Sequence, residues 1–371
     1  MSKIAFATHV ALIDGKEYDG IGNSLLETLP AVTIDFMQIR HSMDGRLDSE
    51  VRYFHDGKLI KKNKLKVVRT PSIFRYLSEI TSTISYFSKN KTDIFIGIDP
   101  LNAFAGVILK KRSKINKIIF YTPDYSPKRF NNKTLNWVYH KIDKYCVNNA
   151  DEVWSVSPKI VKVRKEMGLD DSKNKMLPNV PPEKFDYLKN REKNKFSLIT
   201  YGIIDKQMDF EGMIKAVAIL KDEFPEISYT IVGNGPEEKR LMEVAKQNNV
   251  KNRVFFKGKK SLAETLELAA SAGIGTALYN GEWGFNTYGD STKCREYANF
   301  GLPIISSGKH ATVSDIEKYR AGIIVDLKVE SYVVAIKKVL ASYDNYSKNS
   351  QKMGDKYAGM HKKTLLNMTK N

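Results

Sequence analysis

Hydrophobic runs and helical patterns alternate through the N-terminal half of the chain. Strands are expected at residues 3–9 and 33–40, with a helix at 20–29 between them. Further helices are expected at 72–88, 100–111 and 135–148, and further strands at 93–99, 117–123 and 152–157. Only residues 44–69 depart from this order, and we interpret them as an irregular, hairpin-like insertion. The alternation predicts βαβ units and therefore a parallel sheet covered by helices.

The periodicity stops around residues 177–182, and the charged segment 183–195 carries few structural signals, so we interpret it as a linker. Beyond it, strands are expected at 196–202, 228–233, 253–258, 274–279, 303–307 and 322–326, and helices at 210–224, 236–248, 262–272 and 291–300. Two helical patterns, at 331–342 and 346–357, close the chain. This order predicts a second, doubly wound α/β domain.

The length of the chain also favours two domains. A sequence of 371 residues, 42% of them hydrophobic, is too long for one ordinary core. We place one Rossmann-like domain at 1–180 and a second at 181–345, each with a doubly wound parallel sheet. The terminal helical segment 346–371 is expected to pack back on the first domain.

Signals for membrane spanning, secretion and metal binding are lacking. The sequence has no uninterrupted run of about eighteen apolar residues. Residues 1–6 pass directly into a strand-like run, so we expect a protein made and kept in the cytosol. Cys146 and Cys294 lie far apart, without CxxC or His-rich neighbours, so we expect reduced thiols and no metal site.

The formal charge of +18 is unevenly distributed, because residues 51–150 contain 20 Lys and Arg against 6 Asp and Glu. The basic residues concentrated there include Lys58, Lys61, Lys62, Lys64, Lys66, Arg69, Lys110, Lys111, Arg112, Lys114 and Lys117. One interpretation is that they are solvated loops and helix ends. The other is a face for anionic lipid headgroups, where each such residue contributes about 1 kcal/mol. Nucleic acid is not expected as a partner, since no motif with interleaved aromatic and basic positions is present.

The segment 289–305 carries the most informative chemistry. Asp290 or Ser291 can cap the helix that follows, so the first-turn amides around Thr292 can bind a phosphate. Lys293 adds a charge in that turn, and Glu296 projects from the next, where a carboxylate can accept hydrogen bonds from ribose hydroxyls. The alternative is a capped amphipathic helix in which Lys293 and Glu296 form a solvent-facing pair.

At this segment the chain resembles the retaining family-4 glycosyltransferases and their relatives of the GT-B fold. Glu296 followed by Gly301-Leu302-Pro303-Ile304-Ile305 is similar to their signature, and residues 229–236 (YTIVGNGP) resemble their strand and Gly-x-Gly-Pro turn. The resemblance implies two Rossmann-like domains facing a cleft, with the acceptor on the first and the nucleotide-sugar on the second. It also implies a nucleoside diphosphate sugar as donor substrate, with no metal and no further cofactor.

One position departs from the family pattern. Where the family usually has a second glutamate, eight residues before the ribose-binding one, this chain has Tyr288. We expect the loop 280–286 to replace it, with Glu282 or backbone amides meeting the sugar hydroxyls. Some inverting GT-B enzymes that modify lipid-linked sugars show similar departures, so the stereochemistry stays open.

Two further loops are candidates for phosphate contact. After the first strand of the second domain, residues 201–206 (YGIIDK) offer Lys206, which the resemblance places against the donor diphosphate. The alternative is a plain surface lysine. In the first domain, Gly20 and Gly22 permit close approach of the backbone to a ligand at a helix start.

Carboxylates at strand ends of the first domain are candidates for proton transfer. Asp99 and Asp124 should both point toward the cleft, and Asp124 would suit a general base on the acceptor hydroxyl. The alternative for each is an N-cap or turn aspartate. His9 could contact either substrate, although a lone histidine is more often a packing residue. Trp137, Tyr139 and Tyr145 fit core-facing helix spacing and receive no catalytic role.

These observations favour a glycosyltransferase that transfers a hexose from a nucleoside diphosphate donor, with UDP expected as the nucleotide. The expected acceptor is a glycan or lipid-linked sugar used in cell-surface polysaccharide synthesis, at the inner face of the cytoplasmic membrane. A nicotinamide-dependent oxidoreductase is disfavoured, because residues 20–22 (GIG) lack the third glycine of the dinucleotide-binding motif. A nucleotide-sugar epimerase and a basic membrane-binding protein with a vestigial nucleotide site remain as alternatives.

Overall fold

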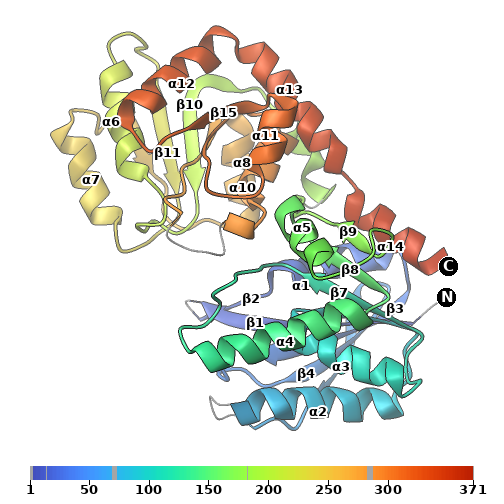
Figure 1. Cartoon of the computed structure of the whole chain (residues 1–371). Helices are drawn as coiled ribbons and strands as arrows, with labels where there is room; N and C mark the ends of the chain where they lie inside the picture. The colour runs from blue at the N-terminus through green and yellow to red at the C-terminus, as the bar shows by residue number, and fades with distance from the viewer. Residues whose placement is uncertain (1–2, 14, 69–72, 182, 282–286, 371) are drawn as a thin grey trace. The chain divides into compact units, whose positions relative to one another are not determined.

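The computed structural model describes residues 3–13, 15–68, 73–181, 183–281 and 287–370, which form two compact units (Figure 1). The first unit combines Met1–Pro178 with Gly359–Asn371, and the second is Asn179–Ala358. Residues 346–358 therefore group with the second unit, whereas we had assigned them to a segment that packs on the first.

The sheet of the first unit has the strand order β5-β4-β3-β1-β6-β7-β8-β9, with β2 paired to β1. Its strands are β1 (Ile4–Ile13), β2 (Lys16–Tyr18), β3 (Asp35–Ser42), β4 (Glu50–His55), β5 (Lys58–Lys64), β6 (Ile94–Ile98), β7 (Lys117–Thr122), β8 (Glu152–Ser155) and β9 (Asn174–Met176). From β3 to β9 all neighbours are parallel. Every residue of β6 is buried, as expected for a parallel strand covered on both faces.

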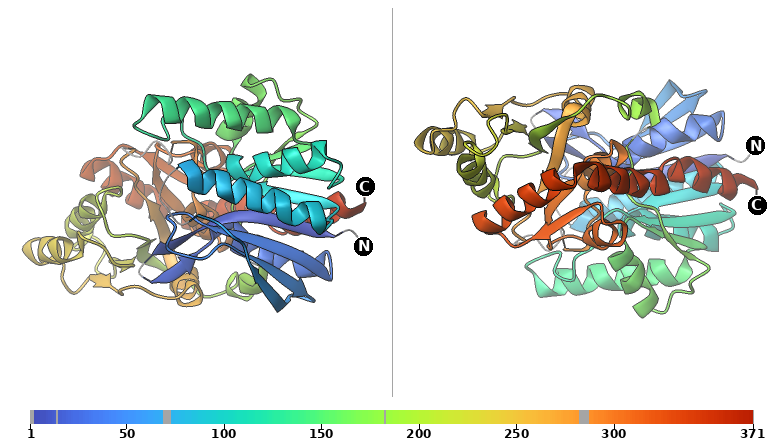
Figure 2. Two further views of the ribbon diagram at one scale, coloured as in Figure 1. Left: turned by 90° about the horizontal axis from the view of Figure 1, so that it is seen from below. Right: turned by 90° about the horizontal axis from the view of Figure 1, so that it is seen from above.

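The helices of the first unit are α1 (Gly20–Thr28), α2 (Ile73–Lys89), α3 (Pro100–Lys111), α4 (Lys133–Asn149), α5 (Pro158–Glu166) and α14 (Met360–Lys370), with a 3-10 turn η1 (Leu29–Ala31). The β1-α1-β3 and β6-α3-β7 crossovers run in opposite directions along the sheet. Because such crossovers are right-handed, α1 and α3 cover opposite faces. Helices α2, α3 and α4 lie next to one another on one face (Figure 2).

The insertion at 44–69 is more regular than predicted. Strands β4 and β5 form an antiparallel hairpin that continues the sheet beyond β3. The turn residues Asp56 and Gly57 both have positive φ, 48° and 70°, as a two-residue turn between twisted strands requires. The charged composition of β5 hid this strand, because an edge strand does not need an apolar face.

The second unit is a fully parallel sheet with the order β12-β11-β10-β13-β14-β15. Its strands are β10 (Asn194–Tyr201), β11 (Ser228–Val232), β12 (Val254–Phe256), β13 (Ala272–Ala277), β14 (Ile304–Ser307) and β15 (Gly322–Val325). Its described helices are η2 (Glu183–Leu188), α6 (Phe210–Leu220), α7 (Glu238–Gln247), α8 (Leu262–Ser271), α10 (Thr292–Asn299), α11 (Val313–Tyr319), α12 (Val329–Ala341) and α13 (Tyr343–Tyr357). Separate apolar cores lie beneath α6 and α12 and beneath α8 and α10.

The C-terminal helices divide between the units. Helix α13 packs against α10 and α11, with Met353 and Ser350 fully buried and the Ser350 hydroxyl donating to the Leu302 carbonyl. Helix α14 packs in the first unit, where buried His361 donates from Nε2 to the Pro178 carbonyl at 2.8 Å. Its Nδ1 lies 2.9 Å from the Ser24 hydroxyl of α1. The expectation for 346–371 was therefore wrong for α13, because its apolar face completes the second core.

Across the described residues, none of the helices combines the length and the hydropathy needed to cross a bilayer.

The loops after β10 and β11 press against each other. Gly202 donates its amide to the Val232 carbonyl at 2.9 Å, and Gly233 lies over it with a φ of 140°. A Cβ atom at Gly233 would lie 1.8 Å from the Gly202 carbonyl oxygen, much closer than two non-bonded heavy atoms can approach. Only glycine fits at residue 233.

We therefore predict that Gly233→Ala destabilises the protein by roughly 2–4 kcal/mol, through the clash and the unfavourable φ. Chemical unfolding of the purified variant measures the change. Gly308→Ala is the matched control, because a Cβ there would meet only Ile324 at 3.8 Å. Equal free energies of unfolding for the two variants would show that the two loops are not in contact.

Candidate active site

Helix α10 begins at Ser291, whose hydroxyl accepts a hydrogen bond from the Cys294 amide at 3.4 Å. Ser291 rather than Asp290 is thus the N-cap, and its hydroxyl also lies 3.1 Å from the Tyr279 hydroxyl. Thr292 follows in the first turn and is exposed. At the start of α10, Thr292 is thus the exposed residue, and helix N-termini are places where anions bind.

Asp290 has a structural role. It is buried, and its carboxylate pairs with Arg295 at 2.8 Å and accepts from the Thr312 hydroxyl at 2.9 Å. It also accepts from the Asn179 amide at 2.9 Å. Arg295 continues the network to Asp315 at 2.7 Å. These contacts hold the start of α10 in place.

Lys293 extends over the loop after β10. Its Nζ lies 3.4 Å from the Tyr279 hydroxyl and 5.4 Å from the centre of that ring. A Cβ atom at Gly202 would lie 3.2 Å from the same Nζ, so only glycine leaves room for the ammonium group at this distance. Burial opposes the charge, but interaction with Tyr279 outweighs burial, and the pKa of Lys293 is raised above its ordinary value.

Glu296 is buried, with 4% of its surface exposed, and accepts a hydrogen bond from the Tyr201 hydroxyl at 2.5 Å. Burial raises the pKa of Glu296 from its ordinary value of 4.5 to about 7, although the Tyr201 hydrogen bond and the Lys293 charge act in the opposite direction. The solvent-facing pair with Lys293 is therefore excluded. Lys293 and Glu296 lie one turn apart with Tyr201, Tyr279 and Gly202 around them.

The raised pKa of Glu296 predicts a pH dependence of stability. The folded state binds this proton more tightly than the unfolded state, so the free energy of unfolding should fall as pH rises from 4.5 to about 7. Glu296→Gln, which cannot ionise, should show a smaller fall. Urea unfolding at about pH 5 and about pH 8 measures the difference. An equal fall in both proteins would show that Glu296 is ionised throughout.

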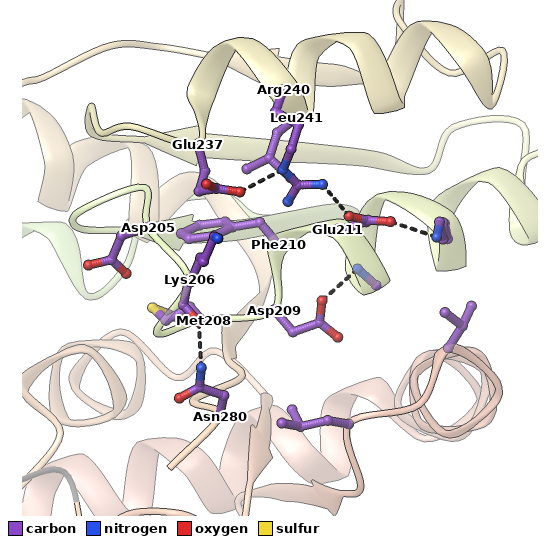
Figure 3. Close-up of a pocket in the computed structure, with 14 residues that line it drawn as sticks. Asp205, Lys206, Met208, Asp209, Phe210, Glu211, Glu237, Arg240, Leu241 and Asn280 are labelled. Atoms are coloured by element: carbon purple, nitrogen blue, oxygen red, sulfur yellow. Dashed lines mark hydrogen bonds and ion pairs between the residues drawn. The ribbon is translucent and has the colours of Figure 1, made fainter. Parts of the chain in front are cut away.

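Lys206 lies at a separate pocket on the α6 and α7 side of the sheet (Figure 3). The pocket has a volume of about 610 Å³, and none of Ser291, Lys293 and Glu296 lines it. Figure 3 shows Arg240 between the carboxylates of Glu211 and Glu237, with Lys206 projecting from the loop before α6. The structure thus groups Ser291, Lys293 and Glu296. Lys206 is exposed and lines a different pocket. Glu282 lies outside the described residues.

In the first unit, the buried carboxylate of Asp19 lies against the first turn of α1, which contains Gly20 and Gly22. A Cβ atom at Gly22 would lie 2.1 Å from Oδ1 of Asp19, whose pKa is raised by burial although a hydrogen bond from the Gly22 amide opposes the rise. Asp19 also accepts from the Thr8 hydroxyl and the Gln38 amide, both at 2.8 Å. Gly22 therefore makes room for the Asp19 carboxylate at the helix start, where we had expected a phosphate, whereas a Cβ atom at Gly20 would meet only the Tyr18 side chain, at 3.6 Å.

Asp99 caps α3, and its Oδ1 accepts from the amides of Leu101 and Asn102. Its Oδ2 lies 2.5 Å from Nδ1 of His9, whose Nε2 lies 3.1 Å from Glu79. Since a carboxylate faces each ring nitrogen, both nitrogens must carry a proton, and His9 is an imidazolium. Burial opposes this charge, but the two acids outweigh it and raise the pKa of His9 to about 10.

Asp99 is consequently a poor general base. Burial raises its pKa, but the His9 charge more than offsets burial and the pKa of Asp99 is lowered overall. Its φ of 74° is unusual for a non-glycine residue and places the carboxylate at the end of β6, the edge where such sheets bind ligands. The N-cap alternative for Asp99 describes the structure, with His9 as the partner that sequence patterns did not reveal.

Asp124 is more accessible, with 40% of its side chain exposed, and pairs with Arg129 at 2.8 Å. The Arg129 guanidinium lies 5.0 Å from the centre of the Tyr139 ring. Burial opposes the charge of Arg129, but Asp124 outweighs it and raises the Arg129 pKa. Of the two aspartates considered for proton transfer, Asp124 is the more exposed, with 40% of its side chain exposed against 18% for Asp99.

Comparison with known proteins shows the fold. Over essentially its whole length, the chain matches the structure of Anabaena HepE in complex with UDP, covering 100% of this chain and 98% of that one, at 12% identity and a TM-score of 0.66. WaaG, a glycosyltransferase involved in lipopolysaccharide biosynthesis, matches over 98% of both chains, at 13% identity and a TM-score of 0.61. The fold is that of the GT-B glycosyltransferases.

The family model for glycosyl transferases group 1 matches residues 183–357, nearly the whole second unit and just under half of the chain. The GtfA subunit of the UDP-N-acetylglucosamine–peptide N-acetylglucosaminyltransferase of Streptococcus pneumoniae is 23% identical over 255 residues, 63% of this chain. Protein CapJ of Staphylococcus aureus is 26% identical over 232 residues, 57% of this chain. The matches span 50% and 58% of these relatives' own lengths, about half of each.

Proposed function

We propose that this protein is a glycosyltransferase that transfers a sugar from a UDP-sugar, bound by the second unit, to a glycan or lipid-linked acceptor bound by the first. The observation that carries the proposal is the buried Glu296 carboxyl, one turn after Lys293 at the start of α10. A carboxylate can accept hydrogen bonds from two ribose hydroxyls. HepE, GtfA and TarM, which share the fold, have been solved with UDP bound, and this supports uracil as the base.

In this proposal, positively charged groups that are fixed in the second unit stabilise the diphosphate as it leaves the donor sugar. As the bond between the sugar and the diphosphate breaks, negative charge grows on the leaving group. Lys293 and the first-turn amides of α10 stabilise that charge without a metal ion, because they are already oriented toward it. The new bond forms to an acceptor hydroxyl, and in this proposal its proton passes to Asp124, which follows the end of β7.

The setting we propose is cell-surface polysaccharide synthesis at the inner face of the cytoplasmic membrane. The excess of basic residues at 51–150 supports contact with anionic lipid. WaaG and a second structural neighbour, the galactosyltransferase WaaB, are proteins of lipopolysaccharide synthesis. An oxidoreductase, an epimerase and a vestigial nucleotide site have no support in the matched family.

The donor site is tested by nucleotide binding. Glu296→Gln and Lys293→Gln should each weaken UDP binding by about tenfold to a hundredfold, since each removes a charged hydrogen-bonding partner. Calorimetric titration with UDP measures the change. Glu226→Gln and Lys251→Gln are the matched controls, because both residues are exposed on the same unit. Unchanged UDP affinity in the two α10 variants would place the donor elsewhere.

The choice of nucleotide needs a separate experiment. The wild-type protein is titrated with UDP-, GDP-, ADP- and dTDP-glucose, and thermal unfolding is followed. A rise in melting temperature confined to the UDP-sugar supports the proposal. A larger rise with another nucleotide would reject uracil as the base.

Asp124 is tested by separating binding from transfer. Asp124→Asn should lower the rate of sugar transfer by about a hundredfold, the range of a lost general base, and leave UDP affinity unchanged. Release of UDP in the presence of membrane extract measures transfer. Asp171→Asn is the control, since Asp171 is an exposed aspartate paired with Lys165. Full transfer by Asp124→Asn would remove Asp124 from the mechanism.

A further inference from the structure

Helix α4 carries an exposed face that combines basic and aromatic side chains. Trp137 and Lys141 follow Lys133 at steps of four residues, and the adjacent Lys144 and Tyr145 come three and four residues after Lys141. We name these five residues the basic aromatic face. The acidic residue of this helix, Asp143, points the other way, is buried and pairs with Arg164. The face therefore presents three positive charges and no negative charge.

The aromatic residues of this face are outside the core, contrary to the sequence interpretation. Trp137 is 61% exposed and Tyr145 is 36% exposed. The core-facing side of α4 is formed instead by Asp143, Cys146 and Val147. A large exposed indole is unfavourable in water, but tryptophan and tyrosine are enriched where protein meets the lipid headgroup region.

Cations lie directly against both rings. Nζ of Lys141 lies 5.4 Å from the centre of the Trp137 ring. Nζ of Lys111, at the end of the neighbouring helix α3, lies 5.0 Å from the Tyr145 ring and 2.8 Å from its hydroxyl. Arg112 follows Lys111 and is also exposed. The charged surface thus continues from α4 onto the end of α3, which lies beside it (Figure 2).

We propose that the basic aromatic face of α4 docks this protein on an anionic lipid bilayer, with Trp137 in the headgroup region and the lysines against lipid phosphates. The proposal rests on the proposed function, because it locates the membrane contact assigned there to residues 51–150. An anionic bilayer matches both features of the face, since lysines attract its negative surface and indole partitions into its interface.

The other lysine-rich element of this region has a different explanation. Strand β5 is exposed along its length and carries Lys58, Lys61, Lys62 and Lys64 at the edge of the sheet. Lysines on an edge strand prevent pairing with the sheet of another molecule. Strand β5 also lies at the opposite end of the strand order from β7 and β8, which α4 connects. The proposed contact between α4 and the bilayer therefore does not include the lysines of β5.

The test is sedimentation of the full chain with vesicles. Vesicles of equal parts phosphatidylglycerol and phosphatidylcholine are compared with vesicles of phosphatidylcholine alone. Binding of the wild type is expected only with phosphatidylglycerol. Lys141→Glu combined with Lys144→Glu should weaken binding at least tenfold, because two attractive charges become repulsive. Trp137→Ala should weaken it severalfold.

Three controls match these variants in charge or size. Lys239→Glu with Lys251→Glu makes the same charge change on exposed residues of the second unit. Lys58→Glu with Lys61→Glu makes it on β5. Tyr187→Ala removes another exposed ring, 68% exposed, from the second unit. All three are expected to retain binding within about threefold.

Each outcome decides the proposal. Equal loss in the α4 and β5 variants, or loss in the β5 variant alone, would overturn the assignment to α4. Wild-type binding to neither vesicle, or equally to both, would overturn the anionic lipid partner. UDP titration of every variant keeps this test separate from the proposed function, because failure of that function removes UDP binding from the wild type, whereas failure here leaves it intact.

Discussion

The burial of the Glu296 carboxyl is the constraint on which the second unit depends. A carboxyl group removed from water is stable only with hydrogen-bond partners, and Tyr201 supplies one from the end of β10. The next residue, Tyr297, fixes the helix to the sheet, because its ring lies against Gly275 and its hydroxyl bonds to the Ile199 and Thr276 carbonyls. The position of this acid therefore follows from the packing of α10 on β10 and β13.

The sequence pattern was sufficient for most of the second unit, because its strands are continuous apolar runs and its helices have clear starts. Ser291, Lys293 and Glu296 could be grouped for the same reason, since they lie within two turns of one helix. Tyr201 could not be assigned to Glu296, because 95 residues separate them and only the strand order brings them together. Long-range pairing is the information that local patterns lack.

The same limit explains the errors in the first unit. Three aromatic residues of α4 suggested a buried face, but their positions are distributed around the helix. The side of α4 that is buried is the one that packs against α3 and Arg164. Burying Asp143 against Arg164 turns Trp137 outward. Likewise, Asp99 could be placed at a strand end from the sequence, but its charge state depends on His9, which belongs to another strand. Fold class is thus set locally, whereas the electrostatics of the site is set by tertiary contacts.

The first unit is discontinuous along the chain, since α14 returns to it after the second unit is complete. A ribosome releases the second unit as one uninterrupted segment, which can fold as soon as it emerges. The first unit must wait for its last helix, and until then His361 is missing from between Pro178 and Ser24. Synthesis of the first unit therefore begins before that of the second and is completed after it, so its basic surface is displayed on an incomplete domain in between.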